Sequence, residues 1–533
     1  MAHRTGRRTT AAAATLGLLA PLFAACGEQG TALAQASEGE GRVALEEGAA
    51  PRRVREPLDP ALRARLTRGV ADIVARACAD AEKCAKGRAP RERIDVAVHV
   101  RHVASGQELV AIRPDAPQRP ASNMKLVTTA AALVLLGARA EYATPVDAVG
   151  ELAGGVLSGD LVVRANGDPL VLPDGNGAVE GRLAELARKL RARGLARVTG
   201  ALVLDEGTFV EPGPGPEWPS ADQRWQEFCA LASGLTINGG VIQAVVTPGE
   251  AGASARVDLH PAPHGLASAV GVWTSSGGGL DVRVGATPST VTVKGSIPSG
   301  ADPFTAEFAH PDPTGYFGRV FAAELARAGI EVEGGLRRER GMGAGTRLGE
   351  LRSPVADSLA LINAESRNGV ADQLFLHLGL VVGGRGDRAG GAAAIRAALA
   401  RLSLPAAGLV QVDGSGLSRA DRVTARQISA LLAAVIELGG VEAGVFRDSL
   451  ALSGRKGTLE DRMKGTVAEG RVRAKTGWIS GVSALSGLAE TAAGGEFVFS
   501  ILVEYPPEAG GLNTSCFKPM QDEILALLVG EGP

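Results

Sequence analysis

Short runs in which apolar and polar residues alternate lie near both ends of the chain, and segments with helical spacing lie between them. Residues 94–100 and 108–112 have the period-two pattern of strands and form a predicted hairpin. Residues 471–476, 482–489 and 496–504 repeat that pattern with short connections, which predicts an antiparallel meander.

Apolar residues at helical spacing predict most of the remaining elements. One helix is expected to begin at Ser122, because serine is a good N-cap residue and an apolar run follows it as far as Gly137. Further helices are expected at residues 62–85, 180–193, 316–330, 358–379, 393–402, 424–438 and 512–529.

The composition of the chain changes near residue 144, and beyond it Gly-rich and Pro-rich stretches separate short Val-rich runs. Residues 157–163 and 198–204 are predicted strands within this part. A chain of 533 residues is too long to fold around a single hydrophobic core, so more than one domain is expected. We therefore expect an α/β (α+β) catalytic domain made of residues 56–145 and 306–533, split by a mostly β inserted domain at 146–305.

Composition narrows the possible partners. Apolar residues make up 45% of the chain, as in soluble globular proteins, and the formal net charge is −2. With few aromatic residues and no basic excess, the chain lacks the usual features of nucleic-acid binding. The sequence does not indicate an oligomeric state.

The N-terminus resembles a targeting signal. Arg4, Arg7 and Arg8 form a basic region, and an apolar run at 11–25 follows that is short for a membrane span. Cleavage after residue 25 would make a lipoprotein with a lipid anchor at Cys26, and cleavage after residue 34 would release a soluble protein. In both cases residues 35–55 form a flexible tether, and the protein is expected to be exported to the periplasm or cell envelope.

The other cysteines and the histidines give no strong site. Cys78 and Cys84 could close a small disulfide loop, whereas Cys229 and Cys516 are too distant in sequence for a pairing to be inferred. His260 and His264 have no acidic or thiol partner nearby, so surface histidines are favoured over metal ligands. No metal or cofactor is expected.

Ser122 and Lys125 are the candidate catalytic residues. Three residues apart at a helix start, their side chains share one face, near N–H groups that carry positive potential. A hydroxyl, an amine and N–H donors are what acyl transfer requires. The pattern alone is weak, because Ser453–Lys456 and Ser515–Lys518 also match it.

Two later motifs strengthen the case for Ser122 and Lys125 as catalytic residues. Ser366-x-Asn368 and Lys475-Thr476-Gly477 follow Ser122-x-x-Lys125 in an order that is typical of penicillin-binding proteins and class A β-lactamases. The blocks at 120–133, 366–378, 413–424 and 465–487 resemble those of class C low-molecular-mass penicillin-binding proteins, which are D-alanyl-D-alanine carboxypeptidases and endopeptidases. The long gap before Ser366 fits an inserted domain in that family.

The resemblance implies a serine transpeptidase/β-lactamase-like domain with a five-stranded antiparallel sheet flanked by helices. It implies hydrolysis of D-Ala-D-Ala bonds or D-Ala cross-links in peptidoglycan through an acyl-enzyme, with β-lactams as inhibitors. Ser122 would be the nucleophile, Lys125 its base and Ser366 a proton relay. The substrate would be held by the residues Asn368, Lys475, Thr476, Gly477 and Trp478, and the N–H groups of Ser122 and Trp478 would form the oxyanion hole.

Trp478 departs from the family, where threonine usually follows Lys-Thr-Gly. Its N–H group survives the change, so the indole bears on substrate access more than on catalysis. Two alternatives remain: a β-lactamase-like esterase on the same fold, and a non-catalytic muropeptide-binding protein. Asp205 could face the substrate from the insertion, although a surface turn is favoured there.

Overall fold

The computed structural model of the chain describes residues 58–170, 180–209, 213–262 and 264–533. The predicted cleavage sites, the lipidation site Cys26 and the tether at 35–55 lie outside these residues. Within the described part, no helix combines the length and the apolar character that crossing a lipid bilayer requires.

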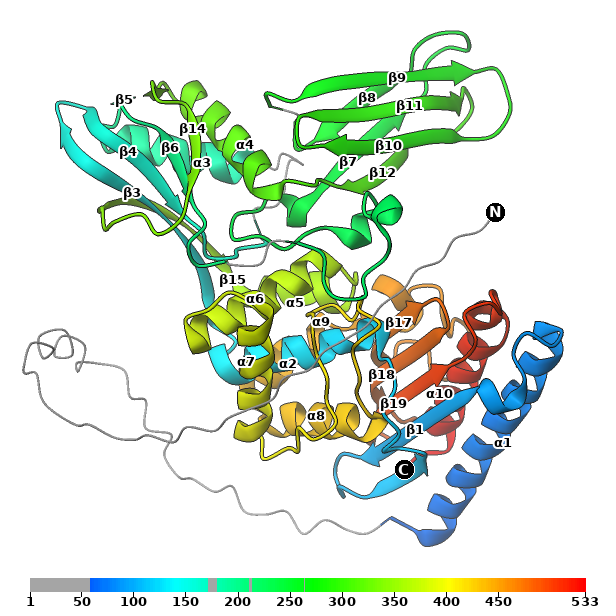
Figure 1. Cartoon of the computed structure of the whole chain (residues 1–533). Helices are drawn as coiled ribbons and strands as arrows, with labels where there is room; N and C mark the ends of the chain where they lie inside the picture. The colour runs from blue at the N-terminus through cyan, green and yellow to red at the C-terminus, as the bar shows by residue number, and fades with distance from the viewer. Residues whose placement is uncertain (1–57, 171–179, 210–212, 263) are drawn as a thin grey trace, which may run out of the picture. The chain divides into compact units, whose positions relative to one another are not determined.

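A six-stranded antiparallel sheet joins the two ends of the described chain (Figure 1). Its order is β16-β17-β18-β19-β1-β2, so the N-terminal hairpin pairs with the last strand of the C-terminal meander. Five of the strands are the predicted ones, and β16 adds a sixth of two residues. Their bounds are β1 Asp95–His102, β2 Glu108–Ile112, β16 Ala451–Leu452, β17 Val472–Ile479, β18 Val482–Glu490 and β19 Glu496–Glu504.

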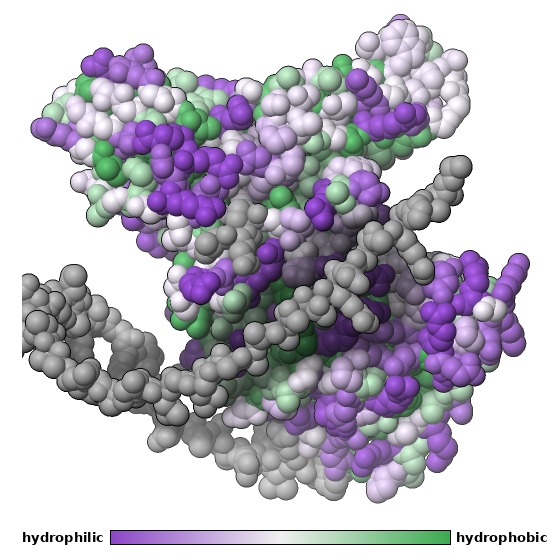
Figure 2. All heavy atoms as spheres, viewed as in Figure 1, coloured by the Kyte–Doolittle hydropathy of each residue, from purple (hydrophilic) through white to green (hydrophobic). Residues whose placement is uncertain are grey.

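The sheet divides the apolar core into two clusters, because side chains alternate along a strand. Val98 of β1 belongs to the cluster that α1 (Pro60–Ala85) and α10 (Lys518–Glu531) share. Its neighbour Ala97 belongs to the other cluster, together with side chains of α8 (Ala425–Glu437). Where α1 and α10 face outward, Figure 2 shows a strongly hydrophilic surface.

The helix that follows Ser122 is buried on all sides. Ten consecutive residues of α2 (Met124–Leu136), from Met124 to Leu133, are buried, as expected for a helix that is apolar all round. The surrounding helices are α5 Val355–Asn363, α6 Asn368–Gly383, α7 Arg388–Arg401, α8 and α9 Gly440–Ser449. The nucleophile candidate therefore stands at the end of the most buried helix of this domain.

Two predicted helix boundaries were wrong in ways that matter for the site. Ser122 is not an N-cap: it lies inside the short 3-10 turn η2 (Ala121–Asn123), and α2 begins at Met124. The helix predicted at 358–379 is two helices, α5 and α6, because Ser366 has a left-handed φ of +67° that no α-helix can contain.

Within the described residues, three further β-sheets lie between residues 141 and 354, a span that includes the predicted insertion and extends past both of its ends. A seven-stranded sheet includes β3 to β6 and β13 to β15, and two three-stranded sheets have the orders β12-β7-β8 and β10-β11-β9. The bounds are β3 Glu141–Ala153, β4 Val156–Arg164, β5 Arg197–Val198, β6 Leu202–Asp205, β7 Val241–Thr247, β8 Arg256–His260, β9 Ala267–Ser275, β10 Asp281–Thr287, β11 Thr290–Pro298, β12 Phe304–Ala309, β13 Glu331–Val332, β14 Leu336–Glu339 and β15 Thr346–Pro354.

The strand predicted at 198–204 is interrupted and forms β5 and β6. At the interruption Gly200 approaches the neighbouring strand so closely that a Cβ there would lie 2.3 Å from Asp160 Oδ1. Elements beyond residue 305 also pair with the insertion: α4 (Pro313–Arg327) packs on α3 (Glu180–Ala192), and β13 pairs with β5. The boundary at 305/306 stays a prediction.

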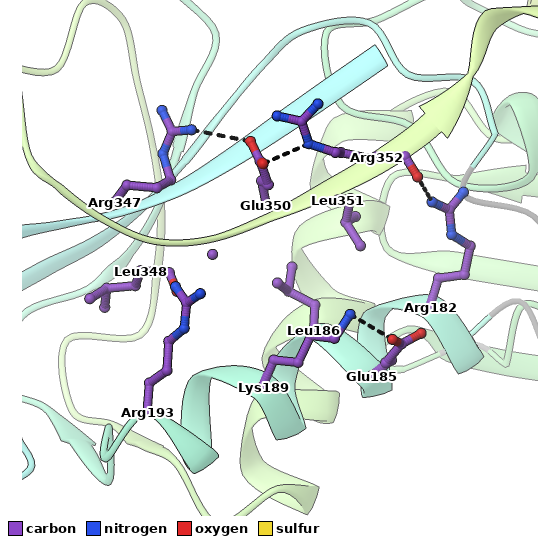
Figure 3. Close-up of a pocket in the computed structure, with 11 residues that line it drawn as sticks. Arg182, Glu185, Leu186, Lys189, Arg193, Arg347, Leu348, Glu350, Leu351 and Arg352 are labelled. Atoms are coloured by element: carbon purple, nitrogen blue, oxygen red, sulfur yellow. Dashed lines mark hydrogen bonds and ion pairs between the residues drawn. The ribbon is translucent and has the colours of Figure 1, made fainter. Parts of the chain in front are cut away.

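One edge of the seven-stranded sheet is closed by arginines rather than by another strand. β15 is an edge strand, and its carbonyls at Leu348 and Arg352 accept hydrogen bonds from Arg193 and Arg182, which stand on or just after α3 (Figure 3). Charged side chains on an edge strand discourage pairing with other chains. A cavity of 520 Å³ between β15 and α3 is lined by these arginines.

The described cysteines are all free thiols, so the predicted small disulfide loop is not formed. Cys78 and Cys84 lie on one helix, α1, six residues apart. Six residues advance a helix by about 9 Å, which exceeds the Cα separation that a disulfide spans.

Candidate active site

The first and third motifs pack directly against each other. Asn123 Nδ2 donates a hydrogen bond of 2.9 Å to the carbonyl of Lys475, which holds η2 against β17. Gly477 is the residue at the contact: a Cβ there would lie 2.8 Å from Pro120 O and 2.9 Å from Asn123 Nδ2. The glycine of Lys-Thr-Gly is thus a packing requirement of the site.

Strained backbone surrounds Ser122. Ala121, which precedes it, has a φ of +47°, and Ser366 has a φ of +67°. Left-handed conformations cost non-glycine residues of order 1–3 kcal/mol and cluster at functional sites. The serine of the second motif also stands in such a turn, between α5 and α6.

Lys125 Nζ makes three hydrogen bonds. It lies 3.0 Å from Ser122 Oγ, 2.5 Å from Asn368 Oδ1 and 2.8 Å from the carbonyl of Ser415. Asn368 and Ser415 offer only acceptors there, so a neutral amine would donate to both and direct its lone pair at Ser122. That is the arrangement of a base that removes the serine proton.

Burial makes the neutral form of the Lys125 amine easier to reach. Lys125 is fully buried, and burial lowers its pKa to about 8, although the nearby carboxyl groups of Asp372, Asp413 and Asp421 oppose the shift. Lys475 is fully buried as well, and its pKa is lowered well below the usual value by burial and by repulsion from Lys125. Protonating both buried amines at once would cost free energy, because each ammonium is desolvated and the two repel each other.

The second motif is held from the insertion. Asn368 Nδ2 donates to the carbonyl of Phe228 at 2.8 Å, which orients its Oδ1 towards Lys125. Arg367 makes a two-point ion pair with Glu307 of β12, at 2.6 and 3.1 Å. Phe228 within the predicted insertion and Glu307 just beyond it therefore set the position of the Ser366–Asn368 turn.

A cavity of 630 Å³ opens at Ser122. Ser366, Asn368 and Trp478 line it, and the Trp478 side chain is 61% exposed. The remaining lining residues are Glu217, Trp218, Pro219, Ser220, Gln223, Glu227, Phe228, Glu365, Gly416, Leu417, Arg419, Ile479 and Ser480. A second cavity of 640 Å³ shares Phe228, Ser366 and Asn368 with it.

Not every predicted contact is present. Lys475 Nζ donates to the carbonyl of Thr476 at 2.9 Å, and Thr476 Oγ1 donates to Thr458 at 3.0 Å. Of the two motif lysines, Lys125 is therefore the one that hydrogen-bonds to the serine hydroxyl, whereas the Lys475 amine is turned to the carbonyl of Thr476. Asp205 does not line the cavity: it is buried in an ion pair with Arg164.

Two loops of the site were missed from the sequence. Residues 413–418 have no helical or strand periodicity, and Trp218 lies in the Pro-rich stretch at 211–219. The only signal was the short run Asp413-Gly414-Ser415-Gly416, whose chemistry appears only when the carbonyl of Ser415 meets Lys125.

Residues 81–515 match the family described as D-Ala-D-Ala carboxypeptidase 3 (S13). A D-alanyl-D-alanine carboxypeptidase of Actinomadura sp. (strain R39) is 33% identical over 422 residues, which is 75% of this chain and 76% of the relative. Carboxypeptidase DacB of Mycolicibacterium smegmatis is 27% identical over 410 residues, covering 75% and 74%.

The fold comparison agrees with these matches. The crystal structure of penicillin binding protein 4 (dacB) from Haemophilus influenzae superposes with a TM-score of 0.69 at 22% identity, over 85% of this chain and 98% of that one. The predicted fold class and the resemblance to low-molecular-mass penicillin-binding proteins are confirmed. The three motifs lie within the matched residues, and the chain belongs to the D-Ala-D-Ala carboxypeptidase 3 (S13) family.

Proposed function

We propose that the protein is a serine DD-peptidase that hydrolyses the terminal D-Ala-D-Ala bond of peptidoglycan peptides, D-Ala cross-links, or both. The observation that carries this proposal is the buried amine of Lys125, 3.0 Å from Ser122 Oγ at the opening of a cavity. Membership of the S13 family supports the same reaction.

In the acylation step, Lys125 takes the proton of Ser122 as Oγ attacks the carbonyl of the penultimate D-Ala. The Oγ–C bond forms and the negative charge moves to the carbonyl oxygen, which the N–H groups of Ser122 and Trp478 would stabilise. The C–N bond then breaks. The proton passes from Lys125 to the leaving amine, with Ser366 as the relay.

The second step returns the enzyme to its starting state. Water attacks the acyl carbon as it gives a proton to Lys125. The Ser122 ester bond then breaks, Lys125 returns that proton to Ser122 Oγ, and the shortened peptide acid is released. Lys475 and Thr476 are the groups assigned to the free carboxylate of the terminal D-Ala. Their side chains stand on β17, the strand whose Trp478 lines the cavity.

β-Lactams should acylate the same serine. A related penicillin binding protein 4 of Haemophilus influenzae has been crystallised with a β-lactam. By the proposed chemistry, Ser122 opens the lactam ring, and the leaving nitrogen stays tethered to the acyl group, so the adduct would persist.

Labelled penicillin tests the nucleophile. The wild-type protein should carry one label on Ser122, and Ser122→Ala should carry none. Ser515→Ala is the matched control, because Ser515 belongs to a competing Ser-x-x-Lys pattern and its hydroxyl hydrogen-bonds to nearby groups, Gly511 O and Cys516 Sγ. Label that persists in folded Ser122→Ala contradicts the proposal.

Product analysis separates the possible activities. Mass spectrometry of cross-linked and linear muropeptides after incubation would show loss of a terminal D-Ala, cleavage of cross-links, or both. Fast turnover of nitrocefin with no release of D-Ala would instead indicate the esterase, and ligand binding with no product would indicate a binding protein.

We also propose that the protein is exported to the periplasm or cell envelope, with Cys26 lipidated or residues 1–34 removed. The support is the basic and apolar N-terminal pattern. The intact mass of protein isolated from the producing cell decides between the two: a diacylated chain beginning at Cys26, or an unmodified chain beginning at residue 35. An uncleaved chain contradicts both.

A further inference from the structure

The loop between α7 and α8 is built around one buried carboxylate. Asp413 is 2% exposed. Its Oδ1 accepts hydrogen bonds from the N–H groups of Ser415 and Gly416, at 3.2 and 2.7 Å. Its Oδ2 accepts from the N–H of Ser418 and from the indole N–H of Trp218, both at 2.8 Å. Four donors on one buried carboxylate compensate for the loss of its hydration.

This loop contacts the catalytic helix directly. The carbonyl of Ser415 accepts from Lys125 Nζ at 2.8 Å, and the carbonyl of Gly414 accepts from Thr128 of the same helix at 2.8 Å. Gly416 has a left-handed φ of +78°, and a Cβ there would lie 1.8 Å from the carbonyl of Ala121. The loop backbone therefore packs on the residue before Ser122.

The same carboxylate reaches the wall of the cavity. Trp218 lines the cavity that opens at Ser122, and its indole nitrogen is bound to Asp413 rather than to solvent. Asp413 thus connects a wall residue of the insertion to the carbonyl that orients Lys125.

The other titratable groups that face Lys125 are Asp372 on α6, Asp421 further along the same loop and Lys475 on β17. Burial, together with the neighbouring Asp413, raises the pKa of both Asp372 and Asp421 well above the usual value. Burial therefore disfavours the charged form of both carboxyl groups. Asp413 differs from both in that its two oxygens accept four N–H hydrogen bonds, and its charge opposes the lowering of the Lys125 pKa.

We propose that Asp413 is a positioning residue: it holds the Ser415 carbonyl on Lys125 and couples that contact to Trp218 in the cavity wall. The inference rests on the proposed acylation of Ser122. Without the Ser415 carbonyl in place, one N–H of Lys125 loses its acceptor, and the lone pair is no longer fixed on Ser122.

Asp413→Asn gives two separable signals in the rate of Ser122 acylation by labelled penicillin, measured against pH. The plateau rate should fall about tenfold or more, because the amide cannot accept four N–H donors. The acid limb should move to lower pH, because removing the charge destabilises the lysine ammonium. A merely structural role would lower stability without moving the limb. An unchanged rate and limb in folded Asp413→Asn overturns the proposal.

Trp218→Phe isolates the coupling if Asp413→Asn fails to fold. The change removes the indole N–H that donates to Asp413 and keeps an aromatic ring in the cavity wall. The plateau rate should fall about threefold to tenfold, and the acid limb should stay where it is in the wild type. Trp225→Phe is the matched control, since Trp225 is an exposed indole outside the lining of this cavity. Equal rates for the two tryptophan variants overturn the proposal.

Amide hydrogen exchange of residues 413–418 keeps the two hypotheses distinguishable. Faster exchange is expected in Trp218→Phe than in the wild type, whatever the reaction. If wild-type Ser122 takes no label yet exchange accelerates, the proposed function fails and the positioning role stands. Unchanged exchange in Trp218→Phe contradicts the positioning role.

Discussion

Asn368 Oδ1 lies 2.5 Å from Lys125 Nζ, and the two residues are 243 positions apart in the chain. The contact joins the start of α6 to the first turn of α2. Because the other end of the same amide donates to Phe228, its oxygen cannot turn away without losing that bond. The insertion thus fixes the polarity of the group that faces the catalytic amine.

Asn368→Asp should shift the pH dependence of acylation. A carboxylate in contact with the amine stabilises the ammonium and raises its pKa, by roughly one to three units for a close pair. Because acylation needs the neutral amine, the acid limb of the rate profile should move to higher pH. The measurement is the rate of penicillin labelling between pH 5 and 10.

Gln427→Glu is the matched control for that charge. Gln427 caps α8 in a capping box with Thr424, and glutamate would keep the bond to the Thr424 N–H while losing the one that Nε2 donates to Ala407 O. It should leave the acid limb where it is in the wild type. If both variants shift the acid limb by the same amount, the shift is caused by the change in overall charge and not by the contact of residue 368 with the Lys125 amine.

Gly477→Ala should separate β17 from η2. The new methyl group would meet Pro120 O at 2.8 Å and Asn123 Nδ2 at 2.9 Å, closer than ordinary van der Waals contact. Overpacking of this kind costs about 1–3 kcal/mol of stability. The rate of Ser122 acylation should fall at least tenfold, because the shift moves the backbone that carries the serine.

Gly444→Ala tests whether any added methyl group has that effect. Gly444 lies in α9, and a Cβ there meets nothing within 4 Å. The change should stabilise the protein by about 0.5–1 kcal/mol in a urea melt and leave acylation unchanged. Normal acylation in Gly477→Ala would show that the close approach is not required.

Trp478→Thr should alter substrate choice more than chemistry. The side chain is 61% exposed at the cavity, and threonine retains the backbone N–H. Acylation by a small β-lactam should stay within about threefold of the wild type, whereas the rate ratio of cross-linked to linear muropeptide should rise as the opening widens. A collapse of β-lactam acylation would instead show that the indole takes part in the reaction.

The sequence predicted the three motifs, their order and most elements of the sheet, because spacing and alternation are local properties. It missed what depends on the backbone path. Ser122 lies in a 3-10 turn since the strained Ala121 precedes it, and α6 begins only after the left-handed Ser366. Contacts of Lys125 with Ser415, and of Asp413 with Trp218, join loops that no periodicity identifies.

Lys125→Met should abolish acylation. Its stability relative to the wild type should be more favourable at neutral pH than at high pH. The pKa of this lysine falls from 10.5 to about 8 on folding, so the unfolded chain binds the proton more tightly. The resulting penalty, on the order of 3 kcal/mol, is complete below pH 8 and disappears as the pH rises through 10.5. Methionine carries no such penalty. In urea melts, the free energy of unfolding of Lys125→Met minus that of the wild type should therefore be larger at pH 7 than at pH 10. A difference that does not vary with pH would mean that the lysine is as easily protonated in the folded protein as in water, and the argument that it serves as the base would fail.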